Sequence, residues 1–167
     1  NNNNVLDVGC GYGVTIPFLK KVGYKSEQIS GIDVSTEMIH HAKAFYPDIG
    51  NADRFIAQDF LQFLTTMREQ QQQQQQQQEE NRNDSSRGMD GGTSSSTAPT
   101  QYHSVVFCSS LHDLPDMKRA LLDTRDVLLV SSGAAHPERT TATPTTTQNS
   151  RIVIVHPQGA SHVQKQT

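Results

Sequence analysis

The stretch "VLDVGCGYG", Val5 to Gly13, decides how this chain folds. A short apolar run closed by glycine is typical of a buried β-strand. The "VTIPFLKKVG" that follows it predicts a helix that starts near Val14 to Ile16, because Pro17 is tolerated only in a first helical turn. A glycine-rich turn between the two allows a ligand to approach the backbone closely. The stretch therefore predicts a ligand-binding loop at the end of the first strand.

The spacing of the glycines narrows the class of ligand. Gly9, Gly11 and Gly13 follow the pattern G-x-G-x-G. The dinucleotide fingerprint G-x-G-x-x-G needs a glycine where Val14 stands, and the phosphate-binding loop needs a lysine that this stretch lacks. Asp7 precedes the glycines on the strand and favours a ligand with a cationic end. For this stretch alone, an ordinary glycine-rich turn remains the alternative.

Working outward, strand and helix signals alternate along the chain. Strands separated by helices of about ten or more residues indicate a mainly parallel sheet with helices on both faces. We therefore expect a doubly wound α/β fold, Rossmann-like, with ligands outside the carboxyl ends of the strands. The predicted strands cover residues 4–9, 28–34, 54–58, 103–110 and 151–157, and the helices 14–23, 35–47, 59–70, 116–130 and a start near 160.

Several helix ends carry their own signals. Ser35, Asp59 and Asp116 are predicted N-caps. Pro47 is expected to end the second helix, and Gly23 is a plausible C-terminal cap of the first.

Two polar tracts interrupt the pattern. A Gln-rich and then Ser/Gly/Asn-rich tract covers about residues 70–100, and a Thr/Ser/Ala-rich tract covers about 131–150. Such compositions are typical of disordered segments, although the glutamines could prolong the preceding helix. Each tract follows a helix and precedes a strand, so both are expected at the amino ends of the strands. We predict one domain over 1–167 with two insertions that leave the opposite edge of the sheet intact.

Charge and cysteine content limit the partners. The net charge is -3 without a basic cluster, so nucleic acid is not an expected partner. Cys10 and Cys108 have no metal-ligand spacing, so no metal site is predicted, and a reducing, cytoplasmic location is the default. No apolar run is long enough to span a membrane. The chain does not begin with Met, and we expect the native N-terminus, with any targeting segment, to be missing.

Acidic residues follow two further strands. Asp33 ends the second strand, about 20 residues beyond the glycines, where an acid in this fold accepts hydrogen bonds from ribose hydroxyls. Asp59 ends the third strand and is followed by Phe60. Besides capping the next helix, Asp59 could accept a hydrogen bond from an adenine amine, with Phe60 beside the ring.

Taken together, "VLDVGCGYG", "GIDVSTEMIHHA", "AQDF" and "VVFCSSLHDLPD" resemble class I S-adenosylmethionine-dependent methyltransferases. The resemblance covers nearly all of the chain outside the two tracts and implies S-adenosyl-L-methionine as cofactor and a small-molecule acceptor. The family's sheet usually continues past a fifth strand, so we expect an incomplete fold here. The oligomeric state is not indicated.

The resemblance also implies roles for single residues. Asp7, Gly9, Cys10, Gly11 and Gly13 would line the methionine and ribose part of the cofactor, and Asp33 would bind the ribose hydroxyls. Val34 and Met38 would pack on the adenine, whose edge Asp59 and Phe60 would hold. Ser109 and Leu111 would face the methyl group.

A general base is needed only if the acceptor must lose a proton. His112 and Asp113, after the fourth strand, are the candidates, and His156 is a further one. Two other functions stay open. One is a non-catalytic cofactor-binding or scaffold protein that interacts through its Gln-rich tract. The other is a nicotinamide-dependent oxidoreductase, which Val14 in place of glycine argues against.

Overall fold

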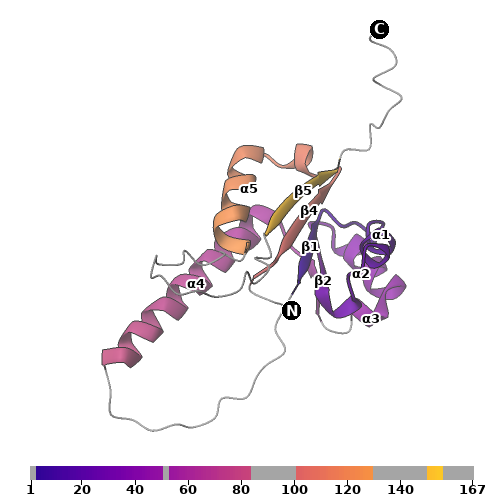
Figure 1. The fold of residues 1–167 in the computed structure, drawn as a ribbon. Coiled ribbons are helices and arrows are strands. Elements are labelled where there is room, and N and C mark those ends of the chain that lie inside the picture. Colours follow the sequence, from indigo (N-terminus) through magenta and orange to yellow (C-terminus); the bar gives the residue numbers. More distant parts are fainter. Residues whose placement is uncertain (1–2, 51–52, 84–100, 130–149, 156–167) are drawn as a thin grey trace, which may run out of the picture.

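The chain forms one five-stranded sheet with helices on both faces (Figure 1). The computed structural model describes residues 3–50, 53–83, 101–129 and 150–155. The strand order is β3-β2-β1-β4-β5, and every neighbouring pair is parallel. This confirms the predicted doubly wound α/β class. The strands are β1 (Val5–Val8), β2 (Ile29–Asp33), β3 (Phe55–Ala57), β4 (Ser104–Cys108) and β5 (Arg151–Val155).

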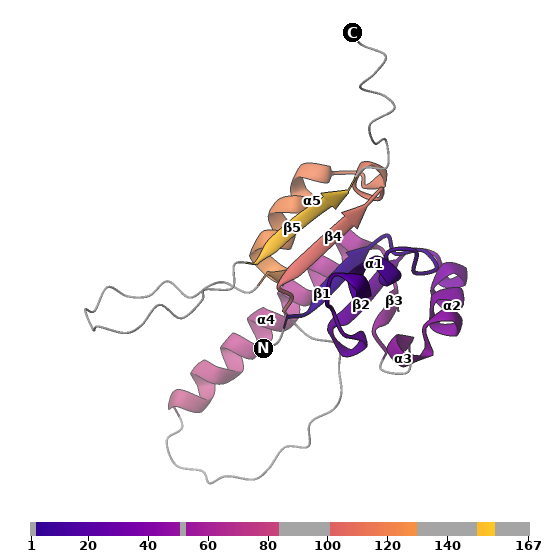
Figure 2. The same cartoon turned by 45° about the vertical axis from the view of Figure 1, so that its right-hand side comes forward.

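The helices form two layers. One face of the sheet carries α1 (Ile16–Lys21), α2 (Thr36–Phe45) and α3 (Pro47–Gly50), and the other carries α4 (Phe60–Asn83) and α5 (Met117–Asp123) (Figures 1 and 2). Short 3-10 turns occupy Ser26–Gln28 and Leu111–Asp113, and a π-helical turn, Thr124–Leu128, follows α5. None of the described helices is both long and apolar enough to cross a membrane.

The predicted caps are present. The Ser35 hydroxyl accepts a hydrogen bond from the Met38 N–H, and the carboxylates of Asp59 and Asp116 accept from backbone N–H groups three residues on. These bonds satisfy N–H groups that a helix start otherwise leaves without a partner. Gly23 follows α1 with φ 107° and ends it as expected.

The core consists of two halves, one on each face of the sheet. Side chains alternate along each strand, so β1 sends Val5 to the α1–α2 side and Leu6 and Val8 to the α4–α5 side. On the α4 side, buried residues recur at helical spacing. These are Phe60, Phe63, Leu64 and Met67. Two-sided burial of β1 is typical of a parallel sheet and fixes the strand that carries the glycine loop.

Three helical segments differ from the prediction. Helix α4 continues through the glutamines to Asn83, held at Gln71 by a side-chain hydrogen bond to the Val127 carbonyl, so the ordered part extends past the boundary expected near residue 70. Helix α5 ends at Asp123, where the buried Thr124 hydroxyl donates to the Ala120 carbonyl and the π-helical turn begins. The single turn α3 after Pro47 was not predicted.

Strand order reverses at β1, because β2 lies on one side of it and β4 on the other. In doubly wound folds the crevice for ligands opens at such a point, outside the carboxyl ends of the strands. Residues 84–100 and 130–149 precede β4 and β5 and therefore connect to their amino ends, as the sequence indicated. The structure of these two ranges, of His156 and of the helix expected near residue 160 lies outside the described residues.

Candidate functional site

The glycine loop leaves β1 and crosses the end of β2. The backbone N–H groups of Gly9 and Cys10 both donate to the Ile32 carbonyl, at 2.8 and 3.1 Å. Gly9 has φ 70° and Gly11 has φ 53°, a left-handed backbone that side-chain-bearing residues adopt rarely. The alternate glycines of the sequence are thus required by the path of this turn.

Asp33 connects the glycine loop to α2. One carboxylate oxygen accepts a hydrogen bond from the Gly11 N–H at 2.9 Å, and the other accepts from the Ser35 N–H at 2.8 Å. A carboxylate offers about four lone-pair positions, so both oxygens retain acceptor capacity toward a ligand. Asp33 is therefore held in a fixed orientation at the carboxyl end of β2 and can still bind hydroxyl groups.

The turn after β4 packs against the glycine loop. The Ser110 hydroxyl donates to the Val8 carbonyl, and a Cβ atom on Gly9 would lie 2.4 Å from the Cβ of Ser110. Only glycine fits at this contact. Ser109 adopts a left-handed backbone, with φ 60°, and its N–H donates to the Val155 carbonyl at 2.9 Å. Residues with such a strained backbone cluster at ligand sites. Here the strained residue is Ser109, which lies between the ends of β4 and β5.

A cavity of about 520 Å³ opens above these elements, at the carboxyl ends of β1, β2, β3 and β4. Its size lies in the range of small-molecule sites. Six of the predicted cofactor residues line it together: Gly9, Asp33, Val34, Asp59, Phe60 and Ser109. The candidate base Asp113 lines it as well. The structure thus brings together residues that lie up to a hundred positions apart in the sequence.

Asp7 does not line this cavity. Its side chain is 1% exposed, and no donor among the described residues reaches either carboxylate oxygen with hydrogen-bond geometry. Burial, opposed by the nearby Thr15 side chain and aided by the charge of Asp33, raises the pKa of Asp7 from 3.8 to about 7. Asp7 therefore lies beneath the glycine loop as a buried acid.

Five other predicted cofactor residues, and His112, are also absent from the cavity lining. The Cys10 thiol is buried in the core, and burial raises its pKa, so only its backbone can face a ligand. Leu111 and His112 line a smaller, neighbouring pocket. The other three do not line the cavity either: Gly11 and Gly13 lie in the glycine loop, and Met38 lies on α2. Their contact with a ligand stays a prediction.

Five lining residues were not selected from the sequence. These are Gln58, Cys108, Ser110, Leu114 and Pro115, besides the strand residues Val8 and Ile32. Gln58 directly precedes Asp59, and Cys108 and Ser110 flank the predicted Ser109. Considering the neighbours of each selected residue would have found these three, whereas Leu114 and Pro115 reach the cavity through the 3-10 turn at Leu111–Asp113.

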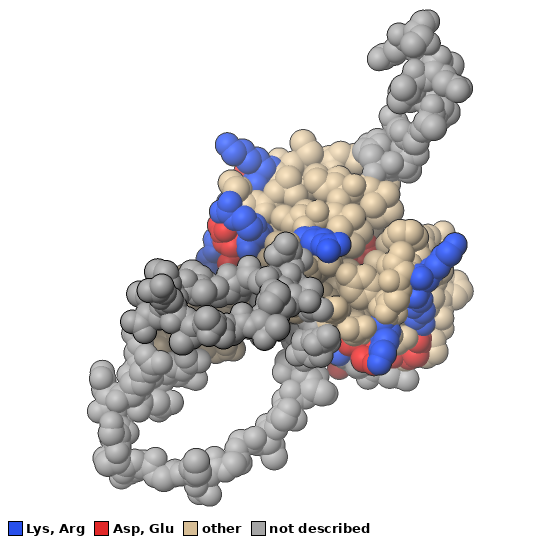
Figure 3. Space-filling view, viewed as in Figure 1, with Lys and Arg blue, Asp and Glu red and all other residues tan. Residues whose placement is uncertain are grey.

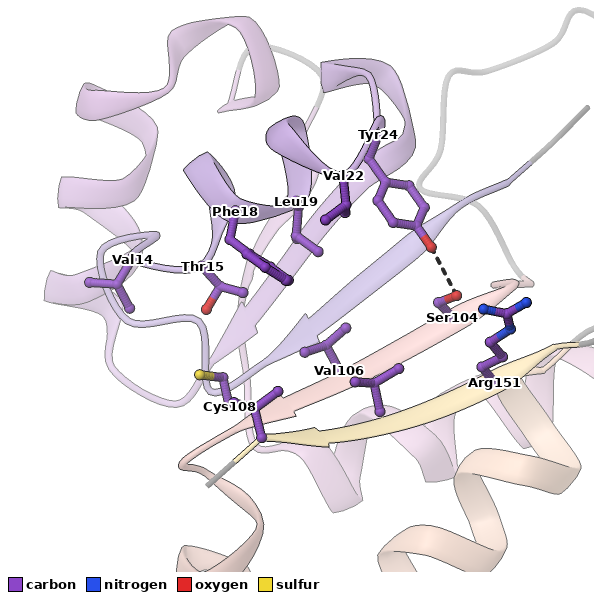
Figure 4. Close-up of a pocket in the computed structure, with 12 residues that line it drawn as sticks. Val14, Thr15, Phe18, Leu19, Val22, Tyr24, Ser104, Val106, Cys108 and Arg151 are labelled. Carbon is purple, nitrogen blue, oxygen red and sulfur yellow. Dashed lines mark hydrogen bonds between the residues drawn. The ribbon is translucent and has the colours of Figure 1, made fainter. Parts of the chain in front are cut away.

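A larger cavity of about 700 Å³ lies on the other side of Cys108 (Figure 4). Its walls are the apolar side of α1 and the faces of β4 and β5, with Phe18 and Val106 pointing into it. Its far end is polar, where Tyr24 and Ser104 share a hydrogen bond of 3.0 Å. None of the residues predicted to bind cofactor lines it, so size alone does not identify the chemical site.

The charge of the cavity of about 520 Å³ limits the kinds of ligand that it can bind. Among the described residues, its lining contains three carboxylates, Asp33, Asp59 and Asp113, and neither lysine nor arginine. The cationic side chains that pair with phosphate are thus missing from this lining, and its carboxylates favour a ligand with hydroxyl, amine or cationic groups. Among the described residues, no group of three or more His, Cys, Asp or Glu side chains could hold a metal ion.

Comparisons with known proteins identify several that are similar to parts of this chain. A protein named "Putative methyltransferase Rv1506c" from Mycobacterium tuberculosis (strain ATCC 25618 / H37Rv) is 40% identical over 50 residues, which is 30% of this chain and 30% of that protein. Two solved structures were also found as similar. "StiE O-MT residues 961-1257" has a TM-score of 0.43 at 19% identity, over 77% of this chain and 34% of that one. The YcgJ protein from Bacillus subtilis has a TM-score of 0.39 at 17% identity, over 76% and 40%.

The chain thus spans about a third of the length of the relatives that it matches. The family comparison covers most of the chain: the model of a methyltransferase domain matches residues 1–133, which contain the glycine loop, Asp33, Asp59 and the turn after β4. On this match, the chain belongs to the methyltransferase domain family.

Proposed function

We propose that this domain transfers a methyl group from S-adenosylmethionine to a small-molecule acceptor. The observation that carries the proposal is the cavity of about 520 Å³ in which Gly9, Asp33, Asp59 and Ser109 meet. Because the glycine loop has no side chains at its left-handed positions, a ligand can contact its backbone. The acidic lining suits a donor that is positively charged at sulfur.

Each part of the lining has a role in this proposal. Asp33 would accept hydrogen bonds from the two ribose hydroxyls, since both its oxygens keep acceptor capacity. Asp59 uses one oxygen to cap α4 and has a second for the adenine amine. Val34 is 74% exposed beside the cavity and offers an apolar surface to the base.

The protein's contribution to the reaction is mainly alignment. When bound, S-adenosylmethionine supplies an activated methyl group, so an in-line displacement needs proximity and orientation above all. The fixed contacts of Ser109 and Ser110 hold the turn that faces the expected methyl position. His112 and Asp113 are the candidate base and its partner, with His112 Nε2 3.3 Å from Asp113 Oδ1.

A small acceptor is favoured over nucleic acid. The net charge is -3, and lysine and arginine side chains are scattered over the face in Figure 3 rather than gathered into one basic area. Binding to a phosphate backbone draws on such an area.

Binding is tested by titrating the chain with S-adenosylhomocysteine in a calorimeter. We expect micromolar affinity with one site, and Asp33→Asn should weaken it about 10- to 100-fold, since hydrogen bonds to charged groups contribute about 1.5–3 kcal/mol. Asp48→Asn is the matched control, because Asp48 pairs with Lys20 on the surface, away from the cavity lining. Equal effects of the two substitutions, or no binding by the unmodified chain, would refute the site.

Turnover is tested separately, by methyl transfer from labelled S-adenosylmethionine into a metabolite extract. Incorporation into small molecules that Asp33→Asn reduces supports the enzyme. Binding of S-adenosylhomocysteine without any incorporation, by this chain and by a longer one, would instead support the non-catalytic alternative.

A further inference from the structure

A second, smaller pocket of about 150 Å³ adjoins the proposed cofactor cavity. It lies at the carboxyl ends of β4 and β5, and we call it the β5-end pocket. Five apolar residues line it, together with Ser109 and His112. The apolar ones are Phe107, Leu111, Met117, Ile154 and Val155.

Exposed apolar side chains surround this pocket. Met117 is 50% exposed, Ile154 53% and Val155 41%. Apolar side chains that gather around a concavity mark ligand sites more often than isolated ones do.

The turn after β4 joins the pocket to the cofactor cavity. Ser109 lines both of them. His112 lines the β5-end pocket while Asp113, whose Oδ1 is 3.3 Å from His112 Nε2, lines the cofactor cavity. A molecule seated in the pocket would therefore present its nearest atom to the space beside Ser109, where the methyl group is expected.

The size and lining define the class of occupant. An apolar cavity of about 150 Å³ accommodates one benzene ring. Phe107 and the Met117 thioether favour an aromatic ring, since sulfur–aromatic and ring–ring contacts are attractive. Among the described residues, the lining holds no lysine, arginine, aspartate or glutamate, so a carboxylate or phosphate group on the ring would lose its hydration without a charged partner there.

We infer that the β5-end pocket binds the acceptor, and that the acceptor is a neutral, single-ring aromatic compound with a hydroxyl group directed at Ser109 and His112. This inference rests on the proposed function. The phenolic oxygen forms a bond to the methyl carbon, while the carbon–sulfur bond breaks and its electron pair stays on the sulfur, which becomes a neutral thioether. The hydroxyl proton passes to the His112 imidazole and then to water, and Asp113 stabilises the imidazolium cation.

Binding is tested without cofactor, by fluorine NMR titration of the full chain with 4-fluorophenol. We expect saturable binding, and at least fivefold weaker binding of 4-fluorobenzoate. Ile154→Asp should weaken 4-fluorophenol binding at least fivefold. Val153→Asp is the matched control, because Val153 is the neighbouring β-branched residue on β5, lines the larger cavity instead and is also exposed. It should change the affinity less than twofold.

Urea unfolding checks that both variants fold. Met117→Glu is a second variant, since an acid in the first turn of α5 suits the helix dipole and still places a charge at the pocket. Absence of saturable binding, or equal weakening by Ile154→Asp and Val153→Asp, would overturn the inference. Because S-adenosylhomocysteine binding is measured separately, loss of the phenol site alone would leave the proposed function in place.

The role of His112 as proton acceptor is tested by the pH dependence of the methyl-transfer rate. In His112→Gln, transfer of the methyl group from S-adenosylmethionine to 4-fluorophenol, measured at saturating phenol, should require higher pH, where the phenol ionises without a base. An unchanged pH profile of the rate would overturn the assignment of His112 as proton acceptor.

Discussion

Strands β1 and β5 have the same kind of sequence and opposite environments. Both are short, parallel and rich in branched apolar residues, "VLDV" and "RIVIV". Every residue of β1 is buried, whereas four of the five residues of β5 are exposed and the fifth is half-buried. The difference arises from position, because β1 lies between β2 and β4 while β5 is the last strand of the described sheet. Strand composition therefore predicts a strand but not its burial.

The same difference in burial distinguishes the cofactor part of the proposed site, at the end of β1, from the acceptor part, at the end of β5. The end of β1 carries the glycine loop over a closed core, which fixes its geometry. The end of β5 borders a pocket between exposed side chains.

Truncating one aliphatic side chain in each strand gives the strongest test of the difference in burial between β1 and β5. Leu6→Ala in β1 removes a side chain with 0% exposure and should lower the free energy of unfolding by about 2–5 kcal/mol. Ile154→Ala in β5 starts from 53% exposure and should cost less than about 1 kcal/mol. Urea unfolding measures both. Similar losses would show that β5 is as buried as β1 in solution.

Asp7 makes β1 sensitive to pH. Its pKa in the folded chain is about 7, against 3.8 as the reference for the unfolded chain, so between these values the folded state holds the proton more often. Stability should therefore fall as pH rises from about 4 to 7, by on the order of 1 kcal/mol per pH unit, and level off above that. Asp7→Asn should flatten this slope, as urea unfolding at several pH values would reveal. A slope that survives the substitution would assign the effect to another group.

A pair of glycine substitutions tests the loop at the end of β1. Both Gly9 and Gly11 have positive φ, but a Cβ atom meets Ser110 at 2.4 Å only at Gly9, while nothing lies within 4 Å at Gly11. Gly11→Ala should cost about 1 kcal/mol from backbone strain, and Gly9→Ala about 1–2 kcal/mol more, because the turn after β4 must shift. Thermal unfolding compares them; equal losses would mean that the contact with Ser110 is not tight.

The sequence predicts the cofactor side of the site better than the acceptor side for a physical reason. Gly9, Asp33 and Asp59 each follow a strand at a fixed offset, and parallel strands bring their ends to one edge, so local motifs suffice. The β5-end pocket depends on Met117 and Ile154 meeting through strand order and through the 3-10 turn at Leu111–Asp113, which no local pattern specifies.

The sequence also does not predict which single residues are buried. Asp7 precedes the glycine loop in the sequence, but alternation along β1 turns its side chain toward Thr15 in the core rather than into the cavity. Likewise, the break after Asp123 in the helix predicted over 116–130 depends on how Thr124 packs, which helical periodicity does not encode.

The most direct test of the central claim maps the binding of S-adenosylhomocysteine on the chain by backbone amide NMR. The account predicts that the largest shifts fall at Gly9, Asp33, Val34, Asp59 and Ser109, the lining of the cavity at the carboxyl ends of the strands. Shifts centred instead on Phe18 and Val106, in the larger apolar cavity, or no shifts at all, would contradict it.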